Sequence, residues 1–236
     1  MIGQALSSDF LKIRRKGLWF LAILGPVGLL AMQALNFGLR YDYLTKQYAD
    51  DLWGGLLDNL LGFVPIALFL GITLVCSLLA NVEHGTSSWK QLLALPISRT
   101  TVFAAKFALS AILIAFSCLL LAIGTVVLGL LLKFGWDDIP VLAILRISFF
   151  PYFAAFPGLA LLLWLCMTVK NQALPITLGV LISVFTIVPL TEWLPISWPL
   201  LGYAGPHQEI FVGAGLGCGL IIFILGAFHF NRKDVN

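Results

Sequence analysis

Residues 82–106, V-E-H-G-T-S-S-W-K-Q-L-L-A-L-P-I-S-R-T-T-V-F-A-A-K, form a polar stretch between two long apolar runs. Gly85 permits a sharp turn where the first run ends. Ser88 and Gln91 have the spacing of a capping box, a pattern that begins a helix. The stretch therefore predicts a loop that contains a helix of its own and is held between two longer helices.

A short amphipathic helix is expected over residues 89–95. Trp89, Leu92 and Leu93 lie at i, i+3 and i+4, so they share one face of this helix. Pro96 ends it, because proline lacks an amide hydrogen and disfavours helical backbone in the residue before it. Two interpretations stay open: the helix contacts a soluble partner in the cytoplasm, or it only anchors the chain in the membrane interface.

The next long helix is expected to be capped by Ser98, a residue type that favours helix N-termini. Arg99 and Lys106 would then lie in its first turns. There we expect them to face lipid headgroups or the same partner.

The composition is that of a membrane protein. Of the 236 residues, 60% are hydrophobic and 11% are charged, and the mean hydropathy is +1.01, whereas a soluble domain has about 25% charged residues. The apolar residues gather in runs of roughly 20, the length of a helix that crosses a bilayer. A closed β-barrel would show short alternating strands instead. We therefore expect an all-α polytopic membrane protein with a single transmembrane domain, residues 1–236.

Six transmembrane helices are expected. The polar loops place them at about 18–39, 60–81, 104–132, 142–169, 174–190 and 210–230. Pro151 and Pro157 would kink the fourth span. In the sixth, Gly213, Gly215, Gly217 and Gly219 allow helices to approach closely, either within the chain or against a second copy, and Gly213 and Gly217 have the G-x-x-x-G spacing.

The N-terminal segment predicts a short interfacial helix. Basic residues gather at positions 12–16, while Leu6, Phe10 and Ile13 recur at helical spacing on the other side. Anionic lipid headgroups would be the counterions. A signal peptide is the alternative, but the following run, 18–39, is long enough to span and precedes further spans.

The distribution of charge predicts the orientation. Six spans put ten of the 14 basic residues on one side and four, Arg40, Lys46, Lys133 and Arg146, on the other. Basic residues concentrate in cytoplasmic loops. Both termini and the polar stretch at 82–106 are therefore expected in the cytoplasm, and the protein in the plasma membrane.

The chain carries little recognisable chemistry. It has no G-x-x-x-x-G-K-[ST] loop for ATP and no H-E-x-x-H motif. Cys76, Cys118, Cys166 and Cys218 lie singly in different apolar runs, where cysteine is small apolar filler. We therefore expect no catalytic residue, metal or cofactor in this chain. Arg146 is the charge nearest the interior of a span; it either snorkels to the outer headgroups or contacts cargo or a partner.

The pattern E-x-G-T-x-x-x-x-x-L-L-x-L-P-I-S-R-x-x-x-x-x-x-K resembles the loop after the second span of ABC-2-type transporter permeases. It is carried here by Glu83, Gly85, Thr86, Leu92, Leu93, Leu95, Pro96, Ile97, Ser98, Arg99 and Lys106. The sequence D-F-L-K-I-R-R at 9–15 is similar to the segment that precedes the first span in members of that family. Size and pattern look like those of the small permeases of lantibiotic-immunity and peptide-antibiotic-resistance exporters.

The resemblance implies a cytoplasmic coupling helix between spans 2 and 3. Such permeases work in pairs, and each docks on a cytoplasmic subunit that binds ATP and Mg²⁺. The coupling loop would consist of Glu83, Gly85, Trp89, Leu92, Leu93, Leu95, Pro96, Arg99 and Lys106. Trp89, Leu92 and Leu95 would make its apolar contacts. Glu83, Arg99 and Lys106 would make its polar ones. The family also tends to have a re-entrant or interfacial helical hairpin before the last span, here at residues 191–209.

The expected function is that of the membrane subunit of an ATP-driven exporter. Its cargo would be a peptide antibiotic or another amphipathic molecule, with no role for nucleic acid, and export would give resistance or immunity. The alternative is a stand-alone secondary carrier or channel, although the internal repeats common in such carriers are not evident. An intramembrane enzyme or scaffold is a third hypothesis, for which no catalytic constellation is found.

Overall fold

The computed structural model describes residues 2–13, 16–85, 98–136, 138–187 and 191–232, and every regular element in these ranges is an α-helix. The all-α class is therefore confirmed for the described residues. The helices are α1 (Ile2–Ile13), α2 (Leu18–Leu39), α3 (Tyr41–Gln47), α4 (Leu52–Leu61), α5 (Phe63–Gly85), α7 (Arg99–Leu131), α8 (Val141–Ala154), α9 (Phe156–Thr168), α10 (Ala173–Phe185), α11 (Trp198–Ala204) and α12 (Gln208–Arg232).

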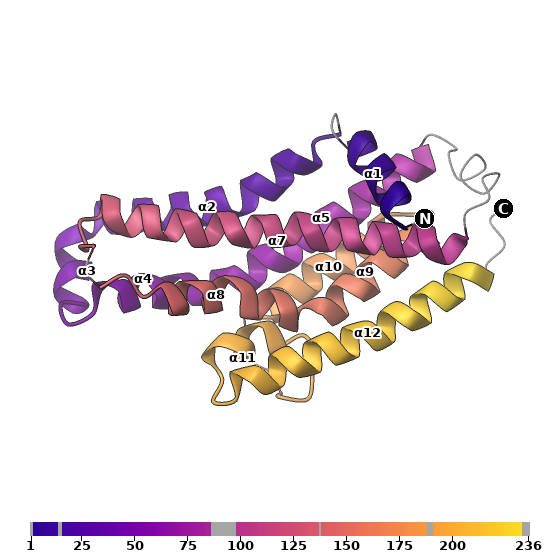
Figure 1. Ribbon diagram of the computed structural model, residues 1–236. Coiled ribbons are helices and arrows are strands. Elements are labelled where there is room, and N and C mark those ends of the chain that lie inside the picture. The colour runs from indigo at the N-terminus through magenta and orange to yellow at the C-terminus, as the bar shows by residue number, and fades with distance from the viewer. Residues whose placement is uncertain (1, 14–15, 86–97, 137, 188–190, 233–236) are drawn as a thin grey trace.

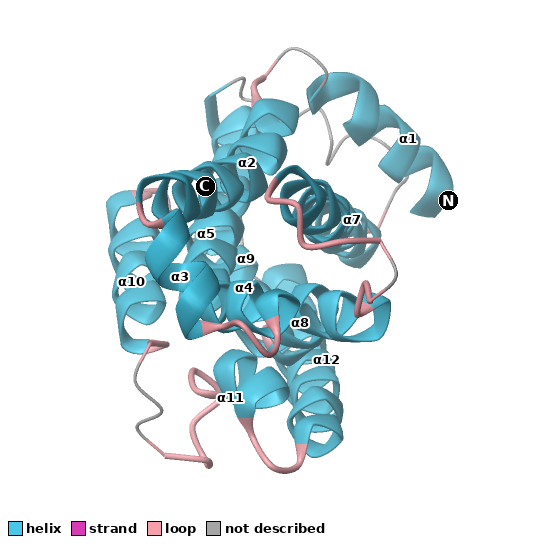
Figure 2. Cartoon of the chain, turned by 90° about the vertical axis from the view of Figure 1, so that its left-hand side faces the viewer, coloured by secondary structure: helices cyan, strands magenta, loops and turns pink. Residues whose placement is uncertain are grey.

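The long helices run between two ends of an elongated bundle (Figure 1). One end carries α1, the start of α7 and the end of α12; we call it the terminal end. The other carries α3, α4 and the turn between α7 and α8, and we call it the distal end. Along the bundle α2 packs on α7 and α5, α10 packs on α5, and α12 packs on α9 (Figure 2).

Four helices are long and apolar enough to cross a bilayer: Leu18–Leu39, Phe63–Val82, Arg99–Leu131 and Gln208–Arg232. The pair α8 and α9 passes the same test as one broken span, which gives up to five among the described residues. The predicted span at 174–190 corresponds to α10, whose 13 residues reach only about 20 Å at 1.5 Å per residue. The structure thus supports four or five spans, and the sixth remains a prediction.

The predicted kink of the fourth span is confirmed, since α8 and α9 meet at 46°. Pro157 lies in the first turn of α9, where its missing amide hydrogen costs nothing. Inside a continuous helix it could not donate to the Phe153 carbonyl and its ring would clash with that carbonyl, so one helix ends and another begins at Ala155. Pro151, by contrast, lies inside α8 without interrupting it.

Of the four glycines predicted to allow close packing of α12, two do so within the chain. A Cβ on Gly215 would stand 2.5 Å from the Ala154 Cα, and one on Gly219 would stand 2.7 Å from the Phe156 Cβ. These two glycines therefore let α12 pass directly over the break between α8 and α9. Gly213 and Gly217, the G-x-x-x-G pair singled out in the sequence, have nothing within 4 Å of such a Cβ and point away from this seam.

The buried side chains form two clusters. One fills the terminal half, where α1, α5, α7, α9 and α12 meet. In it the rings of Phe103 and Phe107 on α7 pack against Phe223 and Phe230 on α12, with centroids 4.8–5.8 Å apart. The other fills the distal half around Trp53 and Phe37. Each half of the bundle thus has an apolar core of its own, and α7 runs through both.

The distal end is closed by α3 and α4, which hydrogen bonds fasten to the long helices. Gln33 on α2 is 1% exposed, and its Nε2 donates to the Asn59 carbonyl at 2.8 Å. Asn59 in turn donates its Nδ2 to the Gly55 carbonyl at 2.7 Å. The Tyr41 hydroxyl donates to the Leu132 carbonyl at the end of α7 (3.0 Å). This cap holds Asp58 of α4 near the first turns of α8.

The segment predicted as a helical hairpin, residues 191–209, contains one short helix among its described residues, α11. α11 packs against α8 and α12 at the side of the bundle (Figures 1 and 2). The Trp198 Nε1 donates to the Glu192 carbonyl at 2.8 Å. The segment returns the chain to the start of α12.

Candidate functional site

The predicted coupling loop is bounded by two well-packed helices at the terminal end. Glu83 and Gly85 lie in the last turn of α5, and Arg99 is the first residue of α7. Trp89, Leu92, Leu93, Leu95 and Pro96 lie outside the described residues. What the structure supplies is therefore the frame on either side of the loop.

Ser98 caps α7, as the sequence predicts. Its backbone is extended (φ −65°, ψ 144°), and its Oγ accepts a hydrogen bond from the Thr101 amide at 3.2 Å. The cap satisfies one of the first amides of the helix, which have no partner within it. α7 thus begins at Arg99, five residues earlier than the predicted span.

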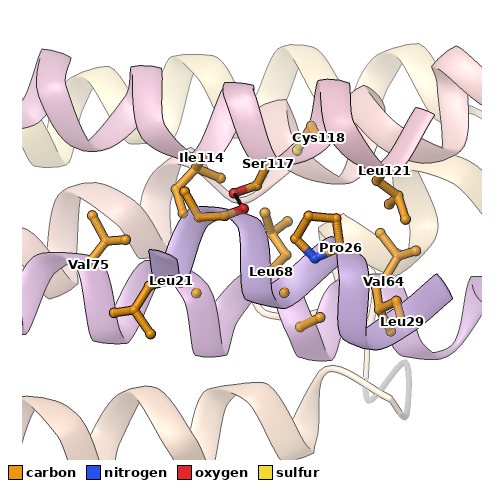
Figure 3. Close-up of a pocket in the computed structure, with 14 residues that line it drawn as sticks. Leu21, Pro26, Leu29, Val64, Leu68, Val75, Ile114, Ser117, Cys118 and Leu121 are labelled. Carbon is orange, nitrogen blue, oxygen red and sulfur yellow. Dashed lines mark hydrogen bonds between the residues drawn. The ribbon is translucent and has the colours of Figure 1, made fainter. Parts of the chain in front are cut away.

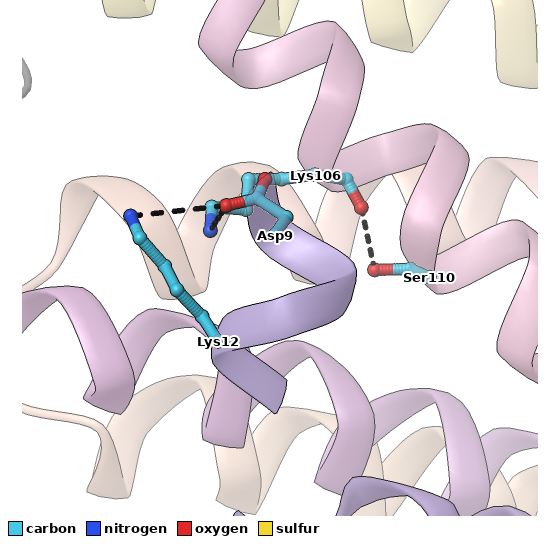
Figure 4. A network of polar contacts seen from close by, with 4 residues as sticks. All are labelled: Asp9, Lys12, Lys106 and Ser110. Atoms are coloured by element: carbon cyan, nitrogen blue, oxygen red, sulfur yellow. Dashed lines mark hydrogen bonds and ion pairs between the residues drawn. The ribbon is translucent and has the colours of Figure 1, made fainter. Parts of the chain in front are cut away.

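Lys106 is buried inside the protein. The sequence had predicted instead that Lys106 contacts lipid headgroups or a partner. It is 1% exposed, and its Nζ is 2.7 Å from Oδ1 of Asp9 on α1, which is 5% exposed (Figure 4). The Lys12 Nζ lies 3.9 Å from the same oxygen. Lys106 is two turns into α7, and α1 lies across that turn, so the ammonium meets a carboxylate before it can reach water.

Asp9 is the functional residue that the sequence reasoning did not single out. One signal was present: only Asp9, Glu83 and Asp234 are acidic on the predicted cytoplasmic side, and a buried lysine needs an acidic partner. The pair joins the lead-in helix to the helix that follows the coupling loop. Because breaking one side of a buried pair leaves an unpaired charge, the pair fixes α1 on α7.

The predicted apolar face of α1 contacts protein instead of lipid. Ile13 is 1% exposed, and Leu6 and Phe10 pack on the core of the terminal half. The ring of Phe10 lies 6.3 Å from that of Trp19 on α2. The interfacial prediction is therefore corrected on this point: the helix is fastened to α7, and Leu11, 70% exposed, faces outward.

An apolar cleft lies midway along the bundle, between α2, α5 and α7 (Figure 3). Its space, including the open mouth, is about 480 Å³, and its walls include Leu21, Leu68 and Ile114. Pro26 of α2 lies at this cleft and lacks an amide hydrogen, so the carbonyl of Ala22 loses its partner within the helix. Ser117 of α7 fills that role, since its Oγ donates to the Ala22 carbonyl at 2.6 Å.

Within the described ranges, no three His, Cys, Asp or Glu side chains are grouped as they would be to hold a metal ion. The cleft is apolar, and the ion pair at the terminal end joins two helices.

In a comparison with known proteins, the model of the ABC-2 family transporter proteins matches residues 5–186, a range that begins within α1 and includes the predicted coupling loop, α7 and the bent pair α8–α9. No curated protein and no solved structure matches the chain.

Proposed function

Since the chain belongs to the ABC-2 transporter family, we propose that it is the membrane-spanning permease subunit of an ATP-driven exporter. A separate cytoplasmic subunit would bind ATP and Mg²⁺, because the sequence has no phosphate-binding loop. A second copy, or a related permease, would complete the transport path. Both termini would lie in the cytoplasm.

The observation that carries this proposal is the family match together with the frame around the coupling loop. α7 follows the loop directly, is capped by Ser98 and is tied to α1 by Lys106 and Asp9. Its 33 residues measure about 50 Å, more than the roughly 30 Å of a bilayer core. A push on the loop by the ATP-binding subunit would therefore move a stiff helix that reaches through the whole membrane.

Amphipathic cargo fits the interior of the bundle. The spans hold few charges, and the cleft between α2, α5 and α7 has apolar walls and lies at mid-bundle. An ion-coupled carrier would need ionisable side chains along its path. A peptide antibiotic is the cargo class that the resemblance to lantibiotic-immunity permeases suggests, and protection of the cell against it would be the result.

The test is reconstitution with the ATP-binding subunit that a neighbouring reading frame would encode. We expect the two proteins to purify together and ATP to drive release of a labelled lantibiotic from the membrane. Trp89→Ala and Leu92→Asp should abolish this transport without unfolding the spans. Trp136→Ala is the matched control, because Trp136 is 75% exposed in the turn that follows α7, at the distal end.

Two results would reject the proposal. Full ATP-dependent transport by both loop variants would remove the docking role of the loop. Transport of solute down an ion gradient by the purified chain alone, with no ATPase, would assign it to the secondary carriers instead.

A further inference from the structure

Arg146 is an isolated charge in an apolar stretch. It lies in the second turn of α8, and no other Asp, Glu, Lys or Arg occurs in residues 141–168. A charge at such a position is costly in a membrane, so it usually pairs with another group or lines a polar cavity. The groups that surround the Arg146 guanidinium therefore indicate its role.

No protein carboxylate neutralises Arg146 among the residues that the structure describes. None of their carboxylate oxygens lies within 4.0 Å of its guanidinium nitrogens. The guanidinium lies 5.8 Å from the centroid of the Phe150 ring, one turn along α8. The side chain is half-buried, and its positive charge is left open to a ligand.

Two hollows flank this guanidinium. The first lies between α4, α8 and α11 and has Asp58 and Tyr203 in its wall; the second lies at the start of α12 and has His207 and Glu209 in its wall. With their open mouths they measure about 1040 and 820 Å³. Arg146 lines both hollows, so each one brings together a cation and a carboxylate that are not paired with each other.

The electrostatics of Tyr203 reflect this mixed charge. Burial raises the pKa of its phenol, Asp58 raises that pKa further, and Arg146 opposes the increase. The hydroxyl therefore lies in the fields of both a negative and a positive group. Gln208 adds polar atoms to both walls and donates its Nε2 to the Tyr203 carbonyl.

We propose that the two hollows together bind the zwitterionic phosphate–ammonium headgroup of an amphiphile. The phosphate would lie against Arg146, whose planar guanidinium matches phosphate oxygens. The ammonium would lie against Asp58 or Glu209. Leu61 and Leu142 form part of the wall of the first hollow and would contact the adjoining chain.

The charge pattern favours a zwitterion over a single ion. A simple anion would meet Arg146 but also two carboxylates, and a simple cation would meet the carboxylates but also the guanidinium. A headgroup in which phosphate and ammonium are joined by a short bridge meets both at once. This inference goes beyond the proposed function, because such binding requires neither ATP nor the ATP-binding subunit.

The test is native mass spectrometry of the purified full chain in detergent, titrated with three probes. The probes are short-chain phosphatidylethanolamine, short-chain phosphatidylglycerol and soluble phosphoethanolamine. We expect the ethanolamine lipid to bind at least tenfold more tightly than the glycerol lipid. Arg146→Gln should weaken its binding at least tenfold, and Arg146→Lys should weaken it less, because the charge remains while the planar fork is lost.

Arg40→Gln is the matched control. Arg40 lies next to α3, and its guanidinium lies 5.4 Å from the Tyr43 ring, a contact much like that of Arg146 with Phe150. The double variant Asp58→Asn and Glu209→Gln should shift preference toward the anionic glycerol lipid. Soluble phosphoethanolamine that binds as tightly as the lipid would identify the free headgroup as the ligand; much weaker binding would identify the lipid.

The proposal is overturned by either of two outcomes. One is equal binding of the ethanolamine lipid to wild type, Arg146→Gln and Arg146→Lys. The other is a preference of the wild type for the glycerol lipid. Size-exclusion elution of each variant shows whether it has folded, and Arg146→Lys keeps the test decisive if Arg146→Gln does not fold.

Discussion

The buried ion pair between Asp9 and Lys106 makes the sharpest prediction at the scale of single residues. Lys106→Met would leave the Asp9 carboxylate, 5% exposed, without its ammonium partner. Losing one member of a buried pair costs about 3–5 kcal/mol. We therefore expect a clearly lower Tm in detergent and faster proteolysis of the α1 segment.

Two companion variants separate the pair from other causes. In Asp9→Leu/Lys106→Met both charges are gone, so most of the Tm should return. Lys12→Ala should change the Tm little, since Lys12 is 34% exposed and 3.9 Å from Asp9. A double variant that is as unstable as Lys106→Met would show that the pair is not the cause.

Ser117 makes a second prediction at this scale. Ser117→Ala would remove the donor to the Ala22 carbonyl and cost about 1 kcal/mol, a typical value for such bonds between membrane helices. Pro26→Ala would give that carbonyl a partner within α2 again. In a double-mutant cycle read out by Tm, the cost of Ser117→Ala should thus be smaller in the Pro26→Ala background; equal costs in both backgrounds would contradict this account.

Individual residues were predictable from sequence where the cause is local. Ser98 caps α7 because the cap needs only its own extended backbone and an amide in the next turn. The partner of Ala22 was not predictable, and for Lys106 the sequence only limited the choice to three acidic residues, because Asp9 is 97 positions away along the chain and Ser117 is 95. Such pairs depend on how helices cross, and a single sequence contains no direct signal of that.

At the scale of elements, the inward-facing and outward-facing glycines of α12 predict different effects of Gly→Ala substitution on stability. Gly215→Ala would place a methyl group 2.5 Å from the Ala154 Cα, and overpacking of this kind typically costs about 1–3 kcal/mol. Gly213→Ala and Gly217→Ala meet nothing within 4 Å in the chain. We expect a lower Tm for Gly215→Ala only.

The measurement is the Tm of each variant in the same detergent. Equal losses in all three variants would contradict this account, because Gly→Ala raises helix propensity by about 1 kcal/mol and only a clash of the added methyl group opposes that gain. If the outward register served a second copy, Gly217→Ala would change the apparent mass in solution without changing the contacts within the chain.

The elements also show which part of the sequence carries structural information. Pro157 predicted the bend between α8 and α9 because proline acts on the helix that contains it. The four glycines predicted a close approach but not which of them make it, since Gly213, Gly215, Gly217 and Gly219 alternate along α12 and only Gly215 and Gly219 meet α8 and α9. The apolar run at 174–190 predicted a span, yet α10 ends at Phe185, because hydropathy gives no signal for a helix end.

At the scale of the whole molecule, composition was enough to predict a helical membrane protein and the approximate positions of its long helices. It was not enough to predict α3 and α4, which close the distal end through Gln33, Asn59 and Tyr41. α3 is polar and aromatic and so resembles a loop, whereas α4 is rich in leucine but has only 10 residues, too few to span a bilayer. Contacts with α2 and α7 make both part of the fold.

The arrangement of the ends predicts the topology. The start of α1 and the end of α12 lie at the terminal end, as do the ends of α5 and α7 that bound the predicted coupling loop (Figure 1). Five full passes would leave the termini on opposite sides, so the chain must return once more. We expect α10 and the described part of the segment that leads to α12 to make that return, although α10 alone is too short to span. A sixth crossing is thus expected to be built from a short helix and irregular chain that rest on α5 and α8.

Labelling with a membrane-impermeant maleimide tests this arrangement in intact cells. Lys46→Cys on α3 should be labelled from outside. Arg232→Cys at the end of α12 should react only after permeabilisation, because basic residues at the terminal end favour the cytoplasm. The unmodified chain is the control, since Cys76, Cys118 and Cys166 are buried. Labelling of both positions from outside would mean that α10 and the following segment do not return the chain, and that the bundle crosses the membrane five times.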